Sequence, residues 1–204
     1  MSAPEATRRA AARLAATRIK LLALDVDGIL TDGSIVWETS VDEPRAPREI
    51  KTFNVRDGLG IKAWQAVGNI VAIVSARASA VTALRAAELG IALCYHGRHG
   101  PAGWDGAGKS KLAALDDALA RTGLTREQTA FMGDDWPDLA VLRSVGLAIT
   151  VPEADDAVRG ACGLVTRADG GRGAVREAIE FILDAQGVLE ATRERIAGGP
   201  MPGG

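Results

Sequence analysis

The chain has 204 residues, of which 47% are hydrophobic and 25% are charged, and its formal net charge is −2. This length suits one domain with one substantial core, and the small net charge provides no broad positive field, so we exclude nucleic acid as a partner. The apolar runs fall well short of the roughly 20 residues that cross a bilayer, and two cysteines are too few for a disulfide framework. We therefore predict a cytoplasmic protein with no membrane segment.

The composition divides the chain into three parts. Residues 1–18 hold four arginines among alanines, which predicts a solvated N-terminal helix or a flexible leader. Residues 19–187 form the predicted domain, and residues 188–204 the predicted C-terminal tail, which ends in the sequence GGPMPGG. Glycine and proline at this density do not hold regular structure.

From Ile19 onward, short apolar runs alternate with amphipathic segments. This alternation is typical of parallel strands joined by helices and predicts an α/β fold with helices on both faces of the sheet. The strand candidates, nearly all apolar, are Lys20–Asp25, Ile70–Val74, Ile91–Tyr95, Thr129–Met132 and Gly146–Thr150. The helix candidates lie near Gly58–Val67, Ala78–Leu89, Lys111–Arg121, Trp136–Ser144 and Gly173–Ala185, and the candidate starting caps are Ser79, Ser110 and Asp135.

The segment 34–54 has a different pattern. A short run, Ser-Ile-Val-Trp, precedes a polar stretch that contains Pro44 and Pro47, and a second run follows from Ile50 to Val55. Two short strand-forming runs around a polar loop predict a β-hairpin that projects from the sheet.

Polar side chains follow the strand candidates at the edge where parallel strands end and where ligands bind in open sheets. The set comprises Asp25 and Asp27 after the first strand, Ser75 and Arg77 after the second, Lys109 and Lys111 beyond the third, and Asp134, Asp135 and Asp138 after the fourth. Any one of these acids, taken alone, would be a turn or cap residue. Several carboxylates at one edge repel each other unless a cation neutralises them, and all-oxygen ligation suits Mg²⁺.

The order of DVDGILTDG, Ser75, a lysine and GDDWPD resembles the haloacid dehalogenase superfamily, which has a Rossmann-like fold. Residues 48–64, 89–97, 133–142 and 170–187 resemble more narrowly the 3-deoxy-D-manno-octulosonate 8-phosphate phosphatases and the related nonulosonate 9-phosphate phosphatases. The resemblance covers about residues 19–187. It implies a phosphatase domain that hydrolyses a small phosphorylated sugar acid.

The resemblance also implies the chemistry of the reaction. Asp25 is the expected nucleophile, which forms an aspartyl-phosphate, and Asp27 is expected to protonate the leaving sugar oxygen and then to activate water. Ser75 and Lys111 are expected to donate hydrogen bonds to the transferring phosphoryl oxygens.

The expected metal ion is Mg²⁺. By resemblance it is held by Asp25, by the backbone carbonyl of Asp27 and by Asp134. Asp135 and Asp138 are expected to orient these ligands without binding the ion themselves.

Positive side chains near the site suit a second anionic group, such as a sugar carboxylate, although each of Lys62 and Arg85 could equally be an exposed helix charge. By resemblance, the residues that contact substrate are Asn54, Val55, Arg56, Asp57, Gly58, Lys62, Arg77 and Arg85.

The spacing of the motifs leaves no room for a large cap domain. Asp25 and Ser75 are 50 positions apart, Ser75 and Lys111 are 36 apart, and the predicted strands and helices occupy most of both intervals. A site without a cap is open to water, so we expect the hairpin and a neighbouring subunit to close it. The resemblance implies a homo-oligomer, with a tetramer as the expected form.

Two other functions fit parts of the sequence. Residues 98–108 look like an insertion relative to the family, and with it Gly103–Ser110 matches the phosphate-binding loop GxxxxGK[ST] of nucleoside-triphosphatases. Such a loop should leave a strand directly, which this one does not, and it leaves Asp25 and Asp27 unexplained. A receiver-like module that keeps a phosphate on Asp25 is the other alternative, and a nearby acid/base at Asp27 argues against it.

Overall fold

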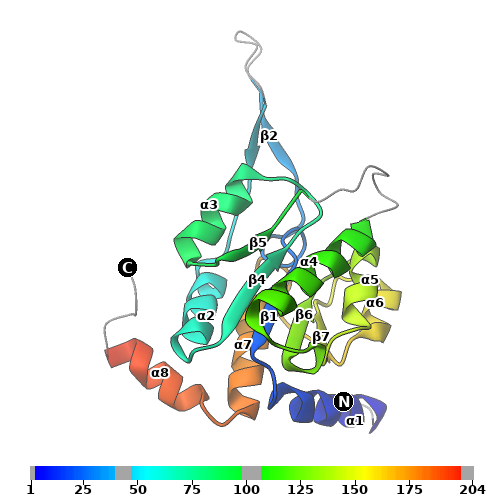
Figure 1. The fold of residues 1–204 in the computed structure, drawn as a ribbon, viewed down its shortest axis with the longest axis vertical. Coiled ribbons are helices and arrows are strands. Elements are labelled where there is room, and N and C mark those ends of the chain that lie inside the picture. The colour runs from blue at the N-terminus through cyan, green and yellow to red at the C-terminus, as the bar shows by residue number, and fades with distance from the viewer. Residues whose placement is uncertain (1–2, 40–46, 98–106, 199–204) are drawn as a thin grey trace.

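The computed structural model describes residues 3–39, 47–97 and 107–198 (Figure 1). Its centre is a parallel six-stranded sheet in the order β5-β4-β1-β6-β7-β8, which confirms the predicted α/β fold. The strands are β1 (Leu21–Leu24), β4 (Ile70–Val74), β5 (Leu93–Tyr95), β6 (Thr129–Met132), β7 (Leu147–Thr150) and β8 (Leu164–Val165).

All five predicted strands form, because each is an apolar run that the sheet buries. The bounds of β4 and β6 are those predicted, and the other three strands begin one or two residues later than predicted. In β1, at the centre of the sheet, every residue is fully buried between neighbours β4 and β6. The sixth strand, β8, was not predicted, since two residues carry no periodic signal.

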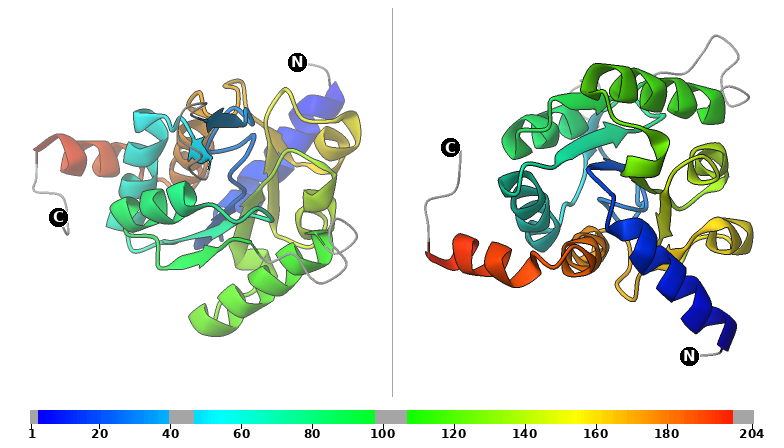
Figure 2. Two further views of the ribbon diagram at one scale, coloured as in Figure 1. Left: turned by 90° about the horizontal axis from the view of Figure 1, so that it is seen from above. Right: turned by 60° about the horizontal axis from the view of Figure 1, so that its bottom comes forward.

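Helices cover both faces of the sheet, as expected for parallel strands (Figure 2). On one face α2 packs against α7, and α7 packs against α1, while on the other face α4 packs against α5. The helices are α1 (Ala3–Ala16), α2 (Val55–Ala66), α3 (Ala80–Leu89), α4 (Ala107–Thr122), α5 (Leu139–Leu142), α6 (Asp156–Ala161), α7 (Ala174–Ala185) and α8 (Leu189–Gly198), with short 3-10 helices η2 (Arg126–Gln128) and η3 (Trp136–Asp138).

Two of the predictions about helices need correction. The segment 136–144, predicted as one helix, is the 3-10 turn η3 followed by the four-residue α5. Ser110 lies inside the first turns of α4 and is not its cap, because α4 begins at Ala107. Helix α6 was not predicted. By contrast, Ser79 does cap α3 by accepting a hydrogen bond from the backbone N–H of Thr82, and Asp135 caps η3.

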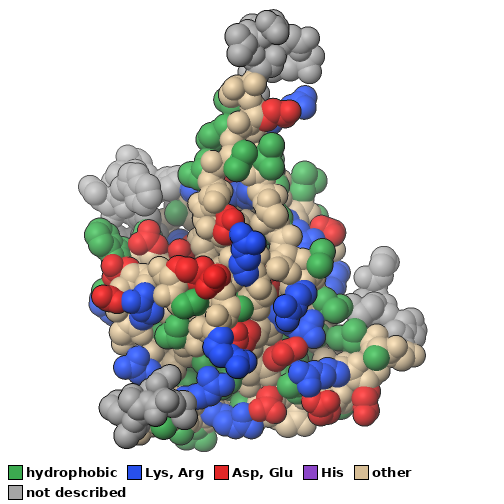
Figure 3. All heavy atoms as spheres, turned by 180° about the vertical axis from the view of Figure 1, so that it is seen from behind, with side chains coloured by type: hydrophobic (Ala, Val, Ile, Leu, Met, Phe, Trp, Pro, Cys, Tyr) green, Lys and Arg blue, Asp and Glu red, His purple; other side chains and the backbone are tan. Residues whose placement is uncertain are grey.

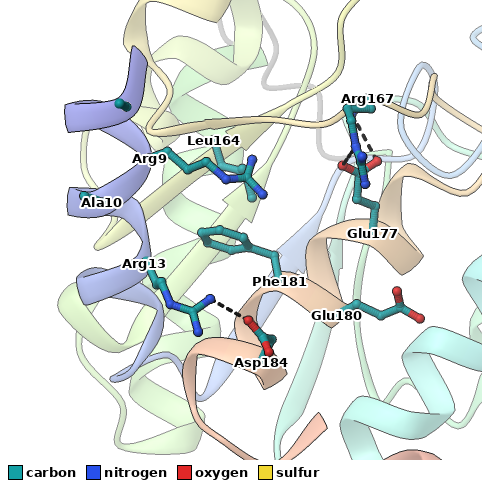
Figure 4. A pocket seen from close by; sticks show the side chains of 10 residues that line it. Arg9, Ala10, Arg13, Leu164, Arg167, Glu177, Glu180, Phe181 and Asp184 are labelled. Carbon is teal, nitrogen blue, oxygen red and sulfur yellow. Dashed lines mark hydrogen bonds and ion pairs between the residues drawn. The ribbon is translucent and has the colours of Figure 1, made fainter. Parts of the chain in front are cut away.

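Both ends of the chain pack more closely on the domain than their composition indicates. Helix α1 buries Ala12 and Ala16, and Arg13 pairs with Asp184 of α7 at 2.5 Å (Figure 4). Helix α8 lies in the segment predicted as a tail, and it buries Thr192. Residues 199–204 lie outside the described part of the chain. Among the described helices, none has the length and apolar character to span a membrane.

The predicted hairpin is confirmed. Strands β2 (Val36–Glu38) and β3 (Arg48–Ile50) pair antiparallel, with Val36 opposite Ile50, and they project from the body of the molecule (Figure 1). Residues 40–46 between them are not described. Within the described ranges no large cap domain is present, and the hairpin is the only excursion from the sheet and its helices.

Candidate active site

The carboxyl ends of β1, β4 and β6 surround one cavity of about 210 Å³. These three strands are neighbours in the sheet, so the polar residues that follow them are brought together as predicted. The cavity is lined by Asp25, Asp27, Gly33, Ser75, Ala76, Arg77, Lys111, Asp134, Asp135, Pro137 and Asp138. A larger hollow of about 370 Å³ lies between α1, α7 and β8, but none of the predicted catalytic residues lines it (Figure 4).

Asp25 directly follows β1 and is buried, and Lys111 of α4 is its cationic partner. Lys111 Nζ lies 2.9 Å from Asp25 Oδ2 and 2.6 Å from Asp138 Oδ1. Burial raises the pKa of the Asp25 carboxyl to about 7 against the opposing effect of Lys111. Burial alone would lower the pKa of Lys111, but the two carboxylates outweigh it and raise that pKa. One lysine is therefore shared between two buried acids.

Asp134 follows β6 and faces the same cavity with an unsatisfied oxygen. Its Oδ1 atom is buried and has no hydrogen-bond partner among the described residues. Burial raises the pKa of Asp134 to about 8, with further contributions from the charges of Asp25 and Asp138. A buried carboxylate oxygen without a donor is costly, so its position suits a cation ligand.

Gly28 makes room for this carboxylate. Its φ of +87° lies in the left-handed region, and a Cβ atom at this position would come within 2.0 Å of Asp134 Oδ2. Only glycine meets both requirements, which explains why the residue after Asp27 lacks a side chain.

The acids fit a divalent cation. One carboxylate oxygen from each of Asp25, Asp134 and Asp138 lies within 4.8 Å of the others. Both oxygens of Asp138 are already bound, one to Lys111 and the other to the backbone N–H groups of Asp134 and Asp135 at 3.3 Å. Asp25 and Asp134 are therefore the candidates for side-chain ligands, and Asp138 holds Lys111 and the backbone after β6.

Asp27 has different surroundings from Asp25. Its Oδ1 accepts a hydrogen bond from Lys51 Nζ, and its Oδ2 lies 3.3 Å from Arg77 Nη1. Both cations also contact Glu49 Oε1, at 3.5 Å from Lys51 and 3.0 Å from Arg77. Lys51 and Glu49 were not among the site residues predicted from the sequence. The period-two alternation of a strand puts these two residues on one side of the hairpin and could have identified them.

Most of the predicted substrate contacts do not line the cavity, with Arg77 as the exception. Asn54 caps α2 by accepting from the backbone N–H of Arg56, and Val55 is 79% exposed. The buried Asp57 accepts hydrogen bonds from Gly173 N at 3.1 Å and Arg176 N at 2.8 Å. Its carboxylate thus caps the N-terminus of α7 within this subunit.

Gly58, Lys62 and Arg85 lie where α2 faces α3, whereas the Arg56 guanidinium lies near Gly173 at the start of α7. Arg85 stacks on the Phe53 ring at 5.6 Å and pairs with Glu88 at 2.7 Å. A Cβ atom on Gly58 would come within 2.4 Å of Arg85 Nη2, and Lys62 Nζ lies beside Gly90. Neither Lys62 nor Arg85 lines the cavity, and the Arg85 side chain is only 15% exposed.

Known proteins with similar sequences identify the family of this chain. A sequence model of haloacid dehalogenase-like hydrolases matches residues 106–179. The 3-deoxy-D-manno-octulosonate 8-phosphate phosphatase KdsC of Escherichia coli K12 is 38% identical over 178 residues, which cover 87% of this chain and 86% of that protein.

Two solved structures are similar over most of their length. The Moraxella catarrhalis 3-deoxy-D-manno-octulosonate 8-phosphate phosphatase, in complex with magnesium, phosphate and KDO, is 37% identical with a TM-score of 0.79, covering 91% of this chain and 97% of that one. The cobalt-bound Haemophilus influenzae phosphatase is 36% identical with a TM-score of 0.74, covering 87% and 94%.

These similarities decide between the functions that the sequence left open. A P-loop nucleoside-triphosphatase and a receiver-like module both fail to account for a match that extends over the whole domain. Residues 98–106, which include most of the apparent insertion and the start of the P-loop pattern, lie outside the described part of the chain. The lysine that reaches Asp25 is Lys111. The chain belongs to the 3-deoxy-D-manno-octulosonate 8-phosphate phosphatase family of haloacid dehalogenase-like hydrolases.

Proposed function

We propose that this chain is a Mg²⁺-dependent phosphatase that hydrolyses 3-deoxy-D-manno-octulosonate 8-phosphate through an aspartyl-phosphate on Asp25. The observation that carries the proposal is the convergence of Asp25, Asp134 and the shared Lys111 on one cavity, in a family whose relatives carry this activity in their names. Asp25, Asp134 and the backbone carbonyl of Asp27 would hold Mg²⁺, which would neutralise charge on the phosphate.

In the first half-reaction, an oxygen of the Asp25 carboxylate attacks phosphorus. The bond from phosphorus to the sugar oxygen breaks, and that oxygen takes a proton from Asp27, so the sugar acid leaves with a free hydroxyl group. Lys111 and Ser75 donate hydrogen bonds to the phosphoryl oxygens, where charge spreads in the transition state. Lys111 is already held next to Asp25 by Asp138.

In the second half-reaction, Asp27 takes a proton from a water molecule that attacks phosphorus. The bond from phosphorus to the Asp25 oxygen breaks, which releases inorganic phosphate and restores the Asp25 carboxylate. Asp27 ends the cycle protonated and ready for the next substrate. This division of labour suits two carboxylates in different environments, one beside Lys111 and Asp134 and the other between Lys51 and Arg77.

The sugar carboxylate is the second anionic group of the proposed substrate. Arg77, at the wall of the cavity, is the candidate within one subunit. We assign Asn54, Val55, Arg56, Gly58, Lys62 and Arg85 to substrate contact only through an assembly that brings α2 and α3 of one subunit to the cavity of a neighbouring subunit. A nonulosonate 9-phosphate, which also carries a carboxylate, remains the alternative substrate.

A homo-oligomer, with a tetramer as the expected form, would supply the missing contacts. Hydrophobic side chains lie exposed along the hairpin (Figure 3), where the apolar residues Ile35, Val36, Trp37 and Ile50 are 47–55% exposed. A projecting patch of this kind is typical of a subunit contact. Light scattering after size exclusion tests the assembly, and a monomer with full activity would contradict it.

A phosphate-release assay tests the function. We expect Mg²⁺-dependent turnover of 3-deoxy-D-manno-octulosonate 8-phosphate, slower turnover of a nonulosonate 9-phosphate, and little with glucose 6-phosphate, which lacks the carboxylate. EDTA should remove the activity. Equal rates on all three substrates would contradict the recognition of a sugar acid, and a preference for the nonulosonate would favour the alternative.

A further inference from the structure

Lys51 is a buried lysine whose role is not explained by the reaction scheme. It follows β3 at the root of the hairpin, and its side chain is only 1% exposed. Burying an ammonium group costs several kcal/mol unless anions compensate it. The anions here are Asp27 and Glu49. Of these two anions, Asp27 lies nearer to Lys51, and Asp27 is the acid/base of the proposed reaction.

The contacts around Lys51 form a closed ring of charges. Asp27 and Glu49 each contact both Lys51 and Arg77, so two negative and two positive groups alternate. Glu49 is fixed in turn by Ser79, whose hydroxyl donates to Glu49 Oε2 at 2.5 Å. The ring links three elements: the loop after β1, the hairpin, and the segment between β4 and α3.

This ring determines how the Asp27 carboxylate is oriented. The two Asp27 oxygens are bound by different cations, Lys51 on Oδ1 and Arg77 on Oδ2. Two anchors on the two oxygens fix the plane of the carboxylate as well as its position. A general acid must lie in line with the oxygen that it protonates, and a misplacement of about 1 Å can cost on the order of 10²-fold in rate.

We propose that Lys51, supported by Glu49, is a positioning residue that fixes the Asp27 carboxylate for proton transfer and ties the root of the hairpin to the acid/base step. The inference rests on the proposed function, in which Asp27 serves both half-reactions. It adds a residue outside the aspartate, serine and lysine motifs to the machinery, and it gives the hairpin a role in the chemistry.

Two substrates with different leaving groups test this role. Protonation matters for a sugar oxygen but little for p-nitrophenolate, whereas hydrolysis of the aspartyl-phosphate needs Asp27 with either substrate. In Lys51→Met we expect kcat on the sugar acid phosphate to fall by about 10²-fold, with KM within about threefold of the wild type. On p-nitrophenyl phosphate we expect a rapid burst of about one p-nitrophenol per active site, followed by slow turnover.

Reference variants separate the roles. Asp27→Asn should give the same burst as Lys51→Met, and Asp25→Asn should give none. Lys51→Arg should recover part of kcat, because it restores a cation. Arg48→Met is the matched control on the same strand, since Arg48 is exposed and contacts only Glu38 among the described residues, and it should behave as the wild type.

Two results would overturn the proposal: wild-type kcat for Lys51→Met on the sugar acid phosphate, or an equal loss on both substrates with no burst. The second result would mean general damage to the site. If Lys51→Met unfolds, Glu49→Gln/Lys51→Met keeps the ring neutral and must show the same burst. Absence of a burst in Asp27→Asn would instead refute the aspartyl-phosphate mechanism, so the two failures are distinguishable.

Discussion

Two groups of acids at the same sheet edge are neutralised in different ways. Among the described residues, Asp25 and Asp138 share one cation, Lys111, and the neighbouring Asp134 has a buried oxygen with no hydrogen-bond partner. At the root of the hairpin, the two acids of the ring meet two cations, Lys51 and Arg77. The first group, three acids with one lysine, is incomplete without a further cation, and the second is balanced by itself. Charge balance therefore separates a metal site from a positioning device.

The largest expected effect comes from the nucleophile. Asp25→Asn keeps the size of the side chain but removes the attacking oxygen, so we expect kcat to fall by roughly 10⁴-fold or more. Steady-state phosphate release measures it. Asp116→Asn is the matched control, since Asp116 is an exposed acid on α4 that pairs with Arg126, and it should keep wild-type kcat. Substantial turnover by Asp25→Asn would place the nucleophile elsewhere.

In EDTA, removal of one negative charge from either group should change the free energy of unfolding in opposite directions. Glu49→Gln leaves the cations of the ring under-compensated, and we expect it to lower the free energy of unfolding by about 2–3 kcal/mol. Asp134→Asn relieves repulsion by Asp25 and Asp138 and should raise it by about 1 kcal/mol. Urea titration at pH 8.5 measures both. A loss of stability in both variants would contradict the distinction.

The incomplete group should also control the metal requirement. Asp134→Asn removes a proposed side-chain ligand, so we expect the Mg²⁺ concentration for half-maximal activity to rise by about 100-fold or more. The Asp135 side chain caps η3, and Asp135→Asn should have a smaller effect. Calorimetric titration with Mg²⁺ provides a readout without turnover. An unchanged affinity in Asp134→Asn would remove Asp134 from the ligand set.

A further expected effect is a dependence of the free energy of unfolding on pH. The pKa values of Asp25 and Asp134 are raised from 3.8 to about 7 and about 8, so the metal-free folded chain holds more protons than the unfolded chain between these limits. The stability that these two acids contribute in their protonated form is fully present below about pH 3.8, and it is lost as the pH rises through 7 and 8. Urea midpoints in EDTA should fall from pH 5 to pH 8.5.

Mg²⁺ should cancel this loss, and its stabilising effect should be larger at pH 8.5 than at pH 5, because binding favours the ionised acids. Asp25→Asn/Asp134→Asn is the control and should remove the slope. A midpoint that rises with pH in EDTA would mean that the acids are compensated without a cation.

The acids of the incomplete group were predictable because their signals are local. Each of Asp25 and Asp134 follows an apolar run long enough to predict a strand, and parallel strands end at one edge. The ring was harder to predict, since Lys51 reaches Asp27 across 24 positions through the fold of the hairpin. Asp57 shows the same limit, because its carboxylate caps α7 more than a hundred positions away.

The class of fold, the order of the motifs and the need for a cation follow from the sequence alone, because apolar periodicity and runs of acids are properties of neighbouring residues. The pairing of each cation with its acids follows from tertiary packing. Lys111 lies between Asp25 and Asp138 because α4 packs beside η3, and Lys51 contacts Asp27 because the root of the hairpin lies beside the sheet edge. Such pairings depend on how separate elements pack, and packing is set by the whole core.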